Sequence, residues 1–145
     1  MIVLDASCLV SLFRGEPGSS DVVAAMVDQC VMNVLNRAEV IDQLTRRGAT
    51  SDVVAAELDT LGINFESLSI ELADRAGRLR SRHYHRSQRP LSMADCVALA
   101  TALELGSGLA TSDVHLAATC IDVKCEVVEI ANSKGVYPLG TRRRS

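Results

Sequence analysis

The sequence predicts an α/β fold, a three-layer α/β/α sandwich around a mostly parallel central sheet of about five strands. Two observations support this class. Short apolar runs of the kind found in buried strands alternate with longer segments in which apolar residues recur at helical spacing. The chain has 145 residues, the length of one ordinary domain, and 48% of them are hydrophobic, which is enough for a full core.

Apolar spacing and polar breaks define the order of the elements. The short apolar runs that we interpret as strands are residues 1–4, 62–65, 109–110 and 125–128. The segments with helical spacing are residues 9–13, 21–30, 36–48, 51–61, 70–82, 92–105 and the stretch that starts at Thr111. No repeat or linker divides the chain. We therefore expect one domain over residues 1–145, with a less ordered tail from about residue 130.

The charge balance argues against a general nucleic-acid-binding protein. Acidic residues outnumber basic ones, 18 to 15, and the formal net charge is -3, whereas such proteins are usually basic. A role with nucleic acid would depend on local charge. One short stretch does carry five arginines: Arg78, Arg80, Arg82, Arg86 and Arg89. The planar guanidinium group can bind two phosphate oxygens at once, although a solvated helix face is the ordinary alternative.

The cysteines and the apolar segments bear on the cellular compartment. The five cysteines are odd in number and most lie in apolar runs, which favours reduced thiols over a disulfide framework. Charged residues interrupt every apolar stretch before it reaches the roughly 18 residues of a membrane-spanning helix. The N-terminus is apolar but has no basic leader. We therefore expect a cytoplasmic protein that does not enter a membrane.

Four carboxylates occupy equivalent positions, each at the end of a predicted strand or the start of a predicted helix: Asp5, Glu39, Asp95 and Asp113. In a parallel sheet, the carboxyl ends of the strands and the starts of the following helices share one edge, which is where ligands bind. Carboxylates that gather there repel one another, and a hard cation such as Mg²⁺ or Mn²⁺ relieves the repulsion. A bound metal ion can also hold a phosphate and help to form a nucleophilic water.

Each acid also has a structural interpretation. Asn36-x-x-Glu39 and Ser92-x-x-Asp95 resemble capping boxes, and an acid in the first turn of a helix, as at Asp113, favours the helix dipole. For any single residue, capping is the more common role. Asp5 differs, because a carboxylate at the end of an apolar run is costly to bury without a partner. Asp5 therefore favours a shared functional role for the four acids. Capping a helix and binding a metal ion are compatible roles.

Several stretches of the chain resemble, in order, the motifs of PIN domains. Met1-Ile-Val-Leu-Asp5-Ala-Ser7 is similar to their first strand, which ends in Asp with Ser or Thr two positions later. The later matches are Gly15-Glu16-Pro17-Gly18, Asn36-Arg-Ala-Glu39-Val, Leu91-Ser-Met-Ala-Asp95-Cys-Val-Ala-Leu-Ala100 and Leu109-Ala-Thr111-Ser-Asp113. Together they span residues 1 to about 116. A short chain of this kind resembles the VapC toxins of bacterial toxin–antitoxin pairs.

The resemblance implies a metal-dependent endoribonuclease, in which water attacks phosphorus and leaves a 5′-phosphate and a 3′-hydroxyl. Asp5, Glu39, Asp95 and Asp113 would bind Mg²⁺, with Mn²⁺ as the alternative ion, and Ser7 and Thr111 would orient the acids or hold water. The resemblance also implies two protein partners. One is a VapB-type antitoxin whose C-terminal segment covers the acidic groove, and the other is a second copy of the chain. We expect some of the five arginines to contact RNA phosphates.

Other classes of protein fit less well. A degenerate PIN-like module that binds RNA or protein without catalysis would tolerate the loss of an acid, and none is lost here. Receiver domains have an adjacent acidic pair after the first strand and haloacid-dehalogenase domains have Asp-x-Asp, whereas this chain has Asp5-Ala6-Ser7. A dinucleotide-binding fold needs a glycine-rich turn after a strand. Here Gly106-Ser107-Gly108 precedes a predicted strand.

Overall fold

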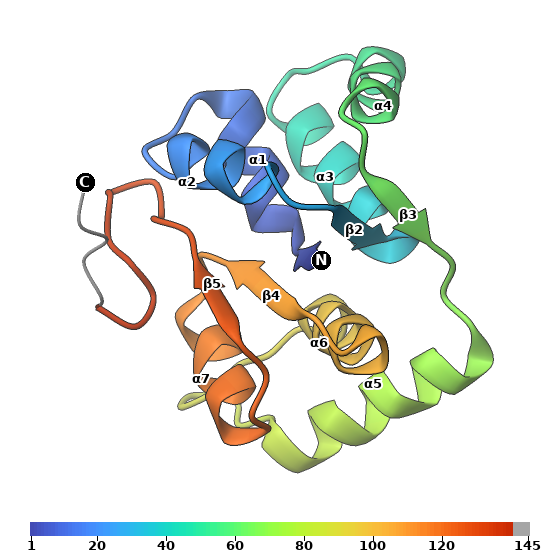
Figure 1. Cartoon of the computed structure of the whole chain (residues 1–145), viewed down its shortest axis with the longest axis vertical. Coiled ribbons are helices and arrows are strands. Elements are labelled where there is room, and N and C mark those ends of the chain that lie inside the picture. The colour runs from blue at the N-terminus through green and yellow to red at the C-terminus, as the bar shows by residue number, and fades with distance from the viewer. Residues whose placement is uncertain (141–145) are drawn as a thin grey trace.

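The computed structural model describes residues 1–140 and shows a sheet between two layers of helices (Figure 1). The strands are β1 (Ile2–Leu4), β2 (Cys30–Asn33), β3 (Asn64–Glu66), β4 (Gly108–Thr111) and β5 (Val127–Glu129). Their order in the sheet is β3-β2-β1-β4-β5, and every neighbouring pair is parallel. The predicted α/β/α sandwich with a five-stranded, parallel sheet is therefore confirmed.

Helices cover both faces of the sheet. The first layer consists of α1 (Ala6–Arg14), α2 (Ser19–Ala25), α3 (Val34–Arg46) and α4 (Ser51–Thr60). The second consists of α5 (Ile70–His83), α6 (Met93–Leu105) and α7 (Val114–Asp122). Strands β2 and β3 are added on one side of β1, and β4 and β5 are added on its other side. The strand order therefore reverses between β1 and β4. Ligands of open α/β sheets bind outside the carboxyl ends of the strands at such a point.

Successive residues of the strands pack on opposite layers. Val3 and Leu109 belong to the apolar cluster with α5, α6 and α7, whereas Leu4 and Ala110 belong to the cluster with α1 to α4. All four of these side chains are fully buried. A sheet covered on both faces explains why its strands are continuous apolar runs in the sequence rather than alternating patterns.

The prediction of one helix over residues 21–30 was wrong. Helix α2 ends at Ala25 and strand β2 begins at Cys30. No glycine or proline marks the turn between them, and all residues of β2 are buried, so the strand has no polar alternation to reveal it. Helix α7 also begins later than predicted, because Thr111 is the last residue of β4.

Residues 130–140 form no helix or strand but pack beside α2. Asp21 accepts hydrogen bonds from the backbone N–H of Ala131 (3.0 Å) and from the hydroxyl of Tyr137 (3.1 Å). Gly18 permits this approach, because a Cβ at that position would lie 2.2 Å from the carbonyl oxygen of Ala131. The arginines at 142–144 lie outside the described residues. Within the described part of the chain, every helix is too short or too polar to cross a membrane.

Candidate active site

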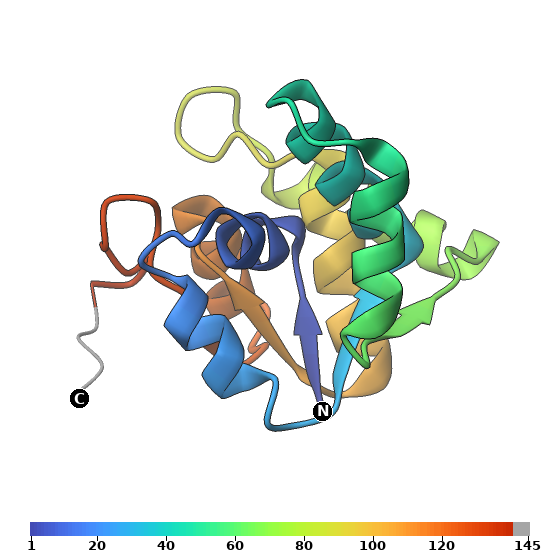
Figure 2. The same ribbon diagram turned by 90° about the horizontal axis from the view of Figure 1, so that it is seen from above.

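Two of the acids, Asp5 and Asp113, lie just after strands β1 and β4, at the point where the strand order reverses. Asp5 directly follows β1, and Asp113 follows β4 by two residues. Both carboxylates cap helices: Asp5 is the N-cap of α1 and Asp113 is the N-cap of α7, and each accepts a backbone N–H from the first turn of its helix. Figure 2 shows β1 running directly into the start of α1 at this edge. Capping therefore fixes both acids at the carboxyl edge of the sheet.

Two hydroxyl groups connect Asp5 to the end of β4. Ser7 Oγ donates a hydrogen bond to Asp5 Oδ1, and Thr111 Oγ1 donates one to Asp5 Oδ2. Each hydroxyl oxygen in turn accepts a backbone N–H, from Ser112 at 3.2 Å and from Asp113 at 2.9 Å respectively. An ionised carboxylate can only accept hydrogen bonds, so the hydrogens of both hydroxyls point to Asp5. The Asp5 carboxylate is thus held from both sides.

The burial of Asp5 makes its charge costly. The residue is only 4% exposed. Burial raises its pKa from 3.8 to about 6, the hydrogen bonds from Ser7 and Thr111 oppose this rise, and the charge of Asp95 adds to it. A cation bound beside Asp5 would favour the charged form that burial disfavours.

Asp95 lies in the first turn of α6 and forms the predicted capping box with Ser92. Its Oδ2 accepts the Ser92 backbone N–H at 2.9 Å, while its own N–H donates to Ser92 Oγ at 3.0 Å. Burial raises the pKa of Asp95, the hydrogen bond from the Ser92 backbone lowers it, and the charge of Asp113 raises it. Since the charge of Asp95 also acts on Asp5 and Glu39, Asp95 is the acid that the other three share as a neighbour.

Glu39 lies in the second turn of α3, and its surroundings differ from the prediction. The N-cap of α3 is Asn33, whose side chain accepts the Leu35 N–H at 3.0 Å, so the capping box predicted from Asn36 and Glu39 is wrong. Asn36 instead donates from Nδ2 to Glu39 Oε2 at 3.1 Å. Burial raises the pKa of Glu39, this hydrogen bond lowers it, and the charge of Asp95 raises it again.

His115 is a neighbour of the acids that the sequence did not bring to attention. It is half-buried in the first turn of α7, two residues after Asp113, and it lowers the pKa of Asp95. The sequence feature that could have indicated His115 is its position two residues after Asp113, at the start of a helix. The other two histidines, at positions 83 and 85, lie at the end of α5 and in the loop that follows.

The donor set of this site suits a hydrated hard cation. Within residues 1–140, no three His, Cys, Asp or Glu side chains come together as ligands of a single metal ion. Mg²⁺ does not need such a cage, because it usually keeps several waters and binds proteins through one or two carboxylates. The candidate donors are all carboxylate oxygens, which select Mg²⁺ or Mn²⁺ over softer metals. The residues present therefore fit a magnesium ion that keeps part of its water shell.

The structure separates the five arginines of residues 78–89 into two groups. Arg80 donates to the Leu91 carbonyl at 2.9 Å and stacks on Tyr84, and Arg89 forms an ion pair with Asp122. Arg78 and Arg82, in contrast, line a hollow of about 310 Å³ between α5 and the ends of α6 and α7, and Arg75 lines it too. In the described residues, the side chains of Arg78, Arg82 and Arg86 have no acidic partner.

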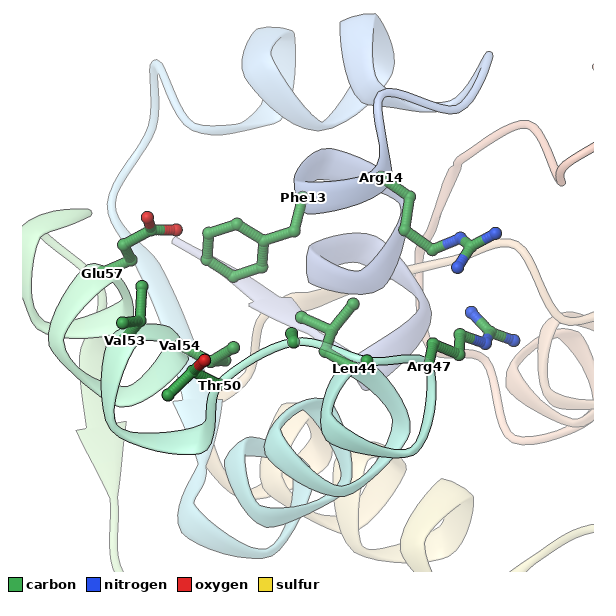
Figure 3. A pocket seen from close by; sticks show the side chains of 10 residues that line it. Phe13, Arg14, Leu44, Arg47, Thr50, Val53, Val54 and Glu57 are labelled. Carbon is green, nitrogen blue, oxygen red and sulfur yellow. The ribbon is translucent and has the colours of Figure 1, made fainter.

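A second hollow, of about 450 Å³, lies between the end of α1 and the junction of α3 with α4 (Figure 3). Phe13 and Leu44 contribute apolar surface to it. The guanidinium groups of Arg14 and Arg47 extend toward the same end, and Glu57 lies at the opposite end (Figure 3). The hollow therefore combines an apolar centre with ends of opposite charge.

Comparison with known families identifies the class of protein. A model of the PIN domain matches residues 2–133, so the chain belongs to the PIN-domain family. The sequence has no significant match among curated proteins.

Solved structures with this fold include several toxins. The chain is similar to VapC20 from Mycobacterium tuberculosis, described as a sarcin-ricin-loop-cleaving toxin, with a TM-score of 0.69 and 18% identity over 81% of this chain and 94% of that one. It is also similar to a toxin–antitoxin complex from Klebsiella pneumoniae (TM-score 0.63, 21% identity, 79% of this chain and 88% of that one). The chain is also similar to FitAcB from Neisseria gonorrhoeae (TM-score 0.63, 19% identity, 88% of this chain and 96% of that one). At these identities the likeness shows the fold alone.

Proposed function

We propose that the chain is a metal-dependent endoribonuclease and the toxin component of a toxin–antitoxin pair. The observation that carries this proposal is the position of Asp95, whose charge opposes the ionisation of Asp5 and Glu39 and whose own ionisation is opposed by Asp113. Acids that disfavour one another's charged forms are typical of functional sites. Membership of the PIN family and the likeness of the fold to toxin structures support the same function.

Mg²⁺, with Mn²⁺ as the alternative ion, would bind among Asp95, Asp5, Glu39 and Asp113, to one or two of them directly and to the others through the waters that it keeps. When bound, the ion supplies Lewis acidity and neutralises charge at the phosphate. The hydrogen bonds from Ser7 and Thr111 favour the ionised form of Asp5 against the effect of burial, and metal binding needs that form. The expected reaction is hydrolysis of an RNA phosphodiester bond to a 5′-phosphate and a 3′-hydroxyl.

The arginines that have no acidic partner are the best candidates to hold RNA. We assign this role to Arg78, Arg82 and Arg86, since an unpaired guanidinium is available for a phosphate. Arg80 and Arg89 are then structural residues, because their guanidinium groups are engaged within the chain. With a formal net charge of -3, the protein would attract RNA through this local group rather than through its overall charge.

A cognate antitoxin and a second copy of the chain are the proposed protein partners. Structures with this fold have been solved as toxin–antitoxin complexes, and we propose that a VapB-type antitoxin binds this chain also. The hollow between Phe13 and Leu44 offers apolar surface for such a partner. Arg47, which has no acidic partner among the described residues, offers charge for an acidic residue beside it, whereas Arg14 is paired with Glu16. Light scattering of the purified chain, alone and with its antitoxin, tests both the dimer and the complex.

The function is tested by cleavage of total cellular RNA with the purified, antitoxin-free chain. Reactions with Mg²⁺, with a chelator and with the Asp95→Asn variant are run in parallel, and the ends of the products are mapped. We expect cleavage that needs both the metal and Asp95 and that leaves 5′-phosphates. If the folded protein cuts nothing with any divalent metal, the alternative is favoured, a non-catalytic PIN-like module that binds RNA or protein.

A further inference from the structure

One buried amide joins the two helices that carry Glu39 and Asp95. Asn36 is 1% exposed. Its Nδ2 donates one hydrogen bond to Glu39 Oε2 and a second to the carbonyl oxygen of Ala94, both at 3.1 Å. Glu39 belongs to α3, and Ala94 is the residue before Asp95 in the first turn of α6. The amide group is therefore a bridge between one candidate metal ligand and the backbone next to another.

The orientation of this amide is fixed by its partners. A carboxylate oxygen and a backbone carbonyl are both acceptors, so only the NH₂ group of Asn36 can face them. This orientation leaves the oxygen atom on the other side of the amide without a hydrogen-bond donor in the described part of the chain. Within residues 1–140, no donor reaches the buried Oδ1 of Asn36, and a buried acceptor without a partner destabilises the fold. An apolar residue of the same size would fill the space without that cost.

We propose that Asn36 is a positioning residue of the metal centre, which holds Glu39 against the first turn of α6 so that Glu39 and Asp95 can share one hydrated divalent cation. This inference rests on the proposed function. Glu39 and Asp95 are like charges in a partly buried site, so they repel one another. Asn36 acts against this repulsion beside the acids, whereas the bond from Asn33 to Thr101, which also joins α3 to α6, lies six residues beyond Asp95 along α6. The two N–H groups of Asn36 supply the bond next to the acids. The unsatisfied Oδ1 is the cost in stability of keeping both donors in place.

The experiment measures Mn²⁺ binding to the full chain by calorimetry, with no RNA present. The test variants are Asn36→Leu, which keeps the branched shape of the side chain but is larger, and Asn36→Ala, a second variant in case the first fails to fold. Loss of a group that orients a metal ligand typically weakens binding by about 10- to 100-fold, and we expect both variants to fall in that range. Circular dichroism checks that each variant is folded.

Asn33→Ala is the matched control. Asn33 is also a fully buried amide at the start of α3, and it also donates two hydrogen bonds that reach other parts of the chain, to Thr101 Oγ1 and the Ser67 carbonyl. None of its partners is one of the four acids. We expect Asn33→Ala to lose thermal stability and to bind Mn²⁺ as tightly as the wild type. An equal loss of Mn²⁺ affinity in both variants would show that Asn36 acts only on stability.

A double-mutant cycle isolates the action through Glu39. In a Glu39→Gln background the ligand is already lost, so Asn36→Ala should cause no further weakening of Mn²⁺ binding. If Asn36→Ala weakens binding as much in that background as in the wild type, the positioning role is wrong. If the wild type binds Mn²⁺ and Asn36→Leu binds it equally well, only this inference fails. If the wild type binds no divalent metal at all, the proposed metal site fails as well.

Discussion

Thr111 donates a hydrogen bond from Oγ1 to Asp5 Oδ2, although the two residues are 106 positions apart in the sequence. The same hydroxyl oxygen accepts the backbone N–H of Asp113 at 2.9 Å. One side chain thus ties the end of β1 to the start of the turn that leads into α7. Two of the four candidate ligands are held in register by this single buried group, which is 0% exposed.

Thr111→Val is expected to weaken the site without unfolding the protein. Valine has nearly the same shape, but it removes the donor to Asp5 and leaves the Asp113 N–H without its acceptor, at a cost of about 1–3 kcal/mol. Cleavage at saturating RNA should fall by about 10- to 100-fold, as for other groups that orient metal ligands. Thr119→Val is the control, because Thr119 is equally buried but donates to the His115 carbonyl. Equal activity losses in the two variants would refute the role of Thr111.

The stability of the metal-free protein is expected to fall as the pH rises from about 4 to about 6. The pKa of Asp5 is about 6 in the folded chain and 3.8 as its ordinary value. Between these values the folded state binds more protons than the unfolded state, so the free energy of unfolding decreases with pH, by up to about 3 kcal/mol from Asp5 alone. The raised pKa values of Asp95 and Glu39 act in the same direction.

Urea unfolding in the presence of a chelator, at pH 4.5 and pH 7.5, measures this dependence. In the Asp5→Asn variant, the free energy of unfolding should depend less on pH than in the wild type. Saturating Mg²⁺ should stabilise the wild type more at the higher pH, because the metal binds ionised carboxylates. A stability that is the same at both pH values in wild type and variant would contradict the assignment of a raised pKa to Asp5.

The elements that the sequence predicted best have local signals. Ser92 is the N-cap of α6, and Gly106 ends that helix in the left-handed conformation, with φ at 61°, as residues of these types do elsewhere. Strand β2 has no such signal. It is defined by hydrogen bonds to β1 and β3, which lie far away in the sequence, and its residues continue the apolar character of α2.

Asp5, Asp95 and Asp113 were proposed as site residues because each occupies a position where a strand ends or a helix begins, and the structure places them there. Glu39 was proposed on the same ground, but it lies in the second turn of α3. The mutual influence of the four acids could not be predicted, since it depends on the strand order that brings β1 and β4 together.

The contacts of Asn36 were also hidden, because an asparagine three residues before a glutamate has the pattern of a capping box. The sequence likewise gave no reason to separate Arg80 and Arg89 from the other arginines, because their partners, Leu91 and Asp122, are identified only by the fold.

Asp95→Asn is expected to make the metal-free protein more stable at pH 7.5 while it abolishes cleavage. The amide oxygen of asparagine can still accept the Ser92 N–H, so the capping box remains, and the charge that opposes the ionisation of Asp5 and Glu39 is removed. Stability lost to such repulsion is the usual cost of a functional site. Differential scanning fluorimetry with and without Mg²⁺ should show a higher Tm than wild type without metal and a smaller rise with it.

Asp52→Asn is the control for this variant. Asp52 is likewise an acid in the first turn of a helix, but it is exposed, and its helix, α4, carries none of the four acids of the site. Its loss should lower Tm slightly through the helix dipole and should leave the response to Mg²⁺ intact. A lower Tm for Asp95→Asn than for the wild type in the absence of metal would mean that repulsion at Asp95 is negligible.

The double variant Arg78→Gln/Arg82→Gln is expected to bind RNA with a weaker dependence on salt. Each phosphate contact on a single strand contributes about 0.7 to the slope of log K against log salt, so two lost contacts should reduce the slope by about 1.4. Arg89→Gln should leave the slope unchanged and lower Tm instead, because it breaks the ion pair with Asp122. Arg46→Gln removes an exposed arginine on α3 that already pairs with Asp42 and controls for the loss of positive charge in general. The slopes are measured by fluorescence anisotropy with the cleavage-deficient Asp95→Asn protein. An unchanged slope in the double variant would exclude the hollow beside α5 as a phosphate site.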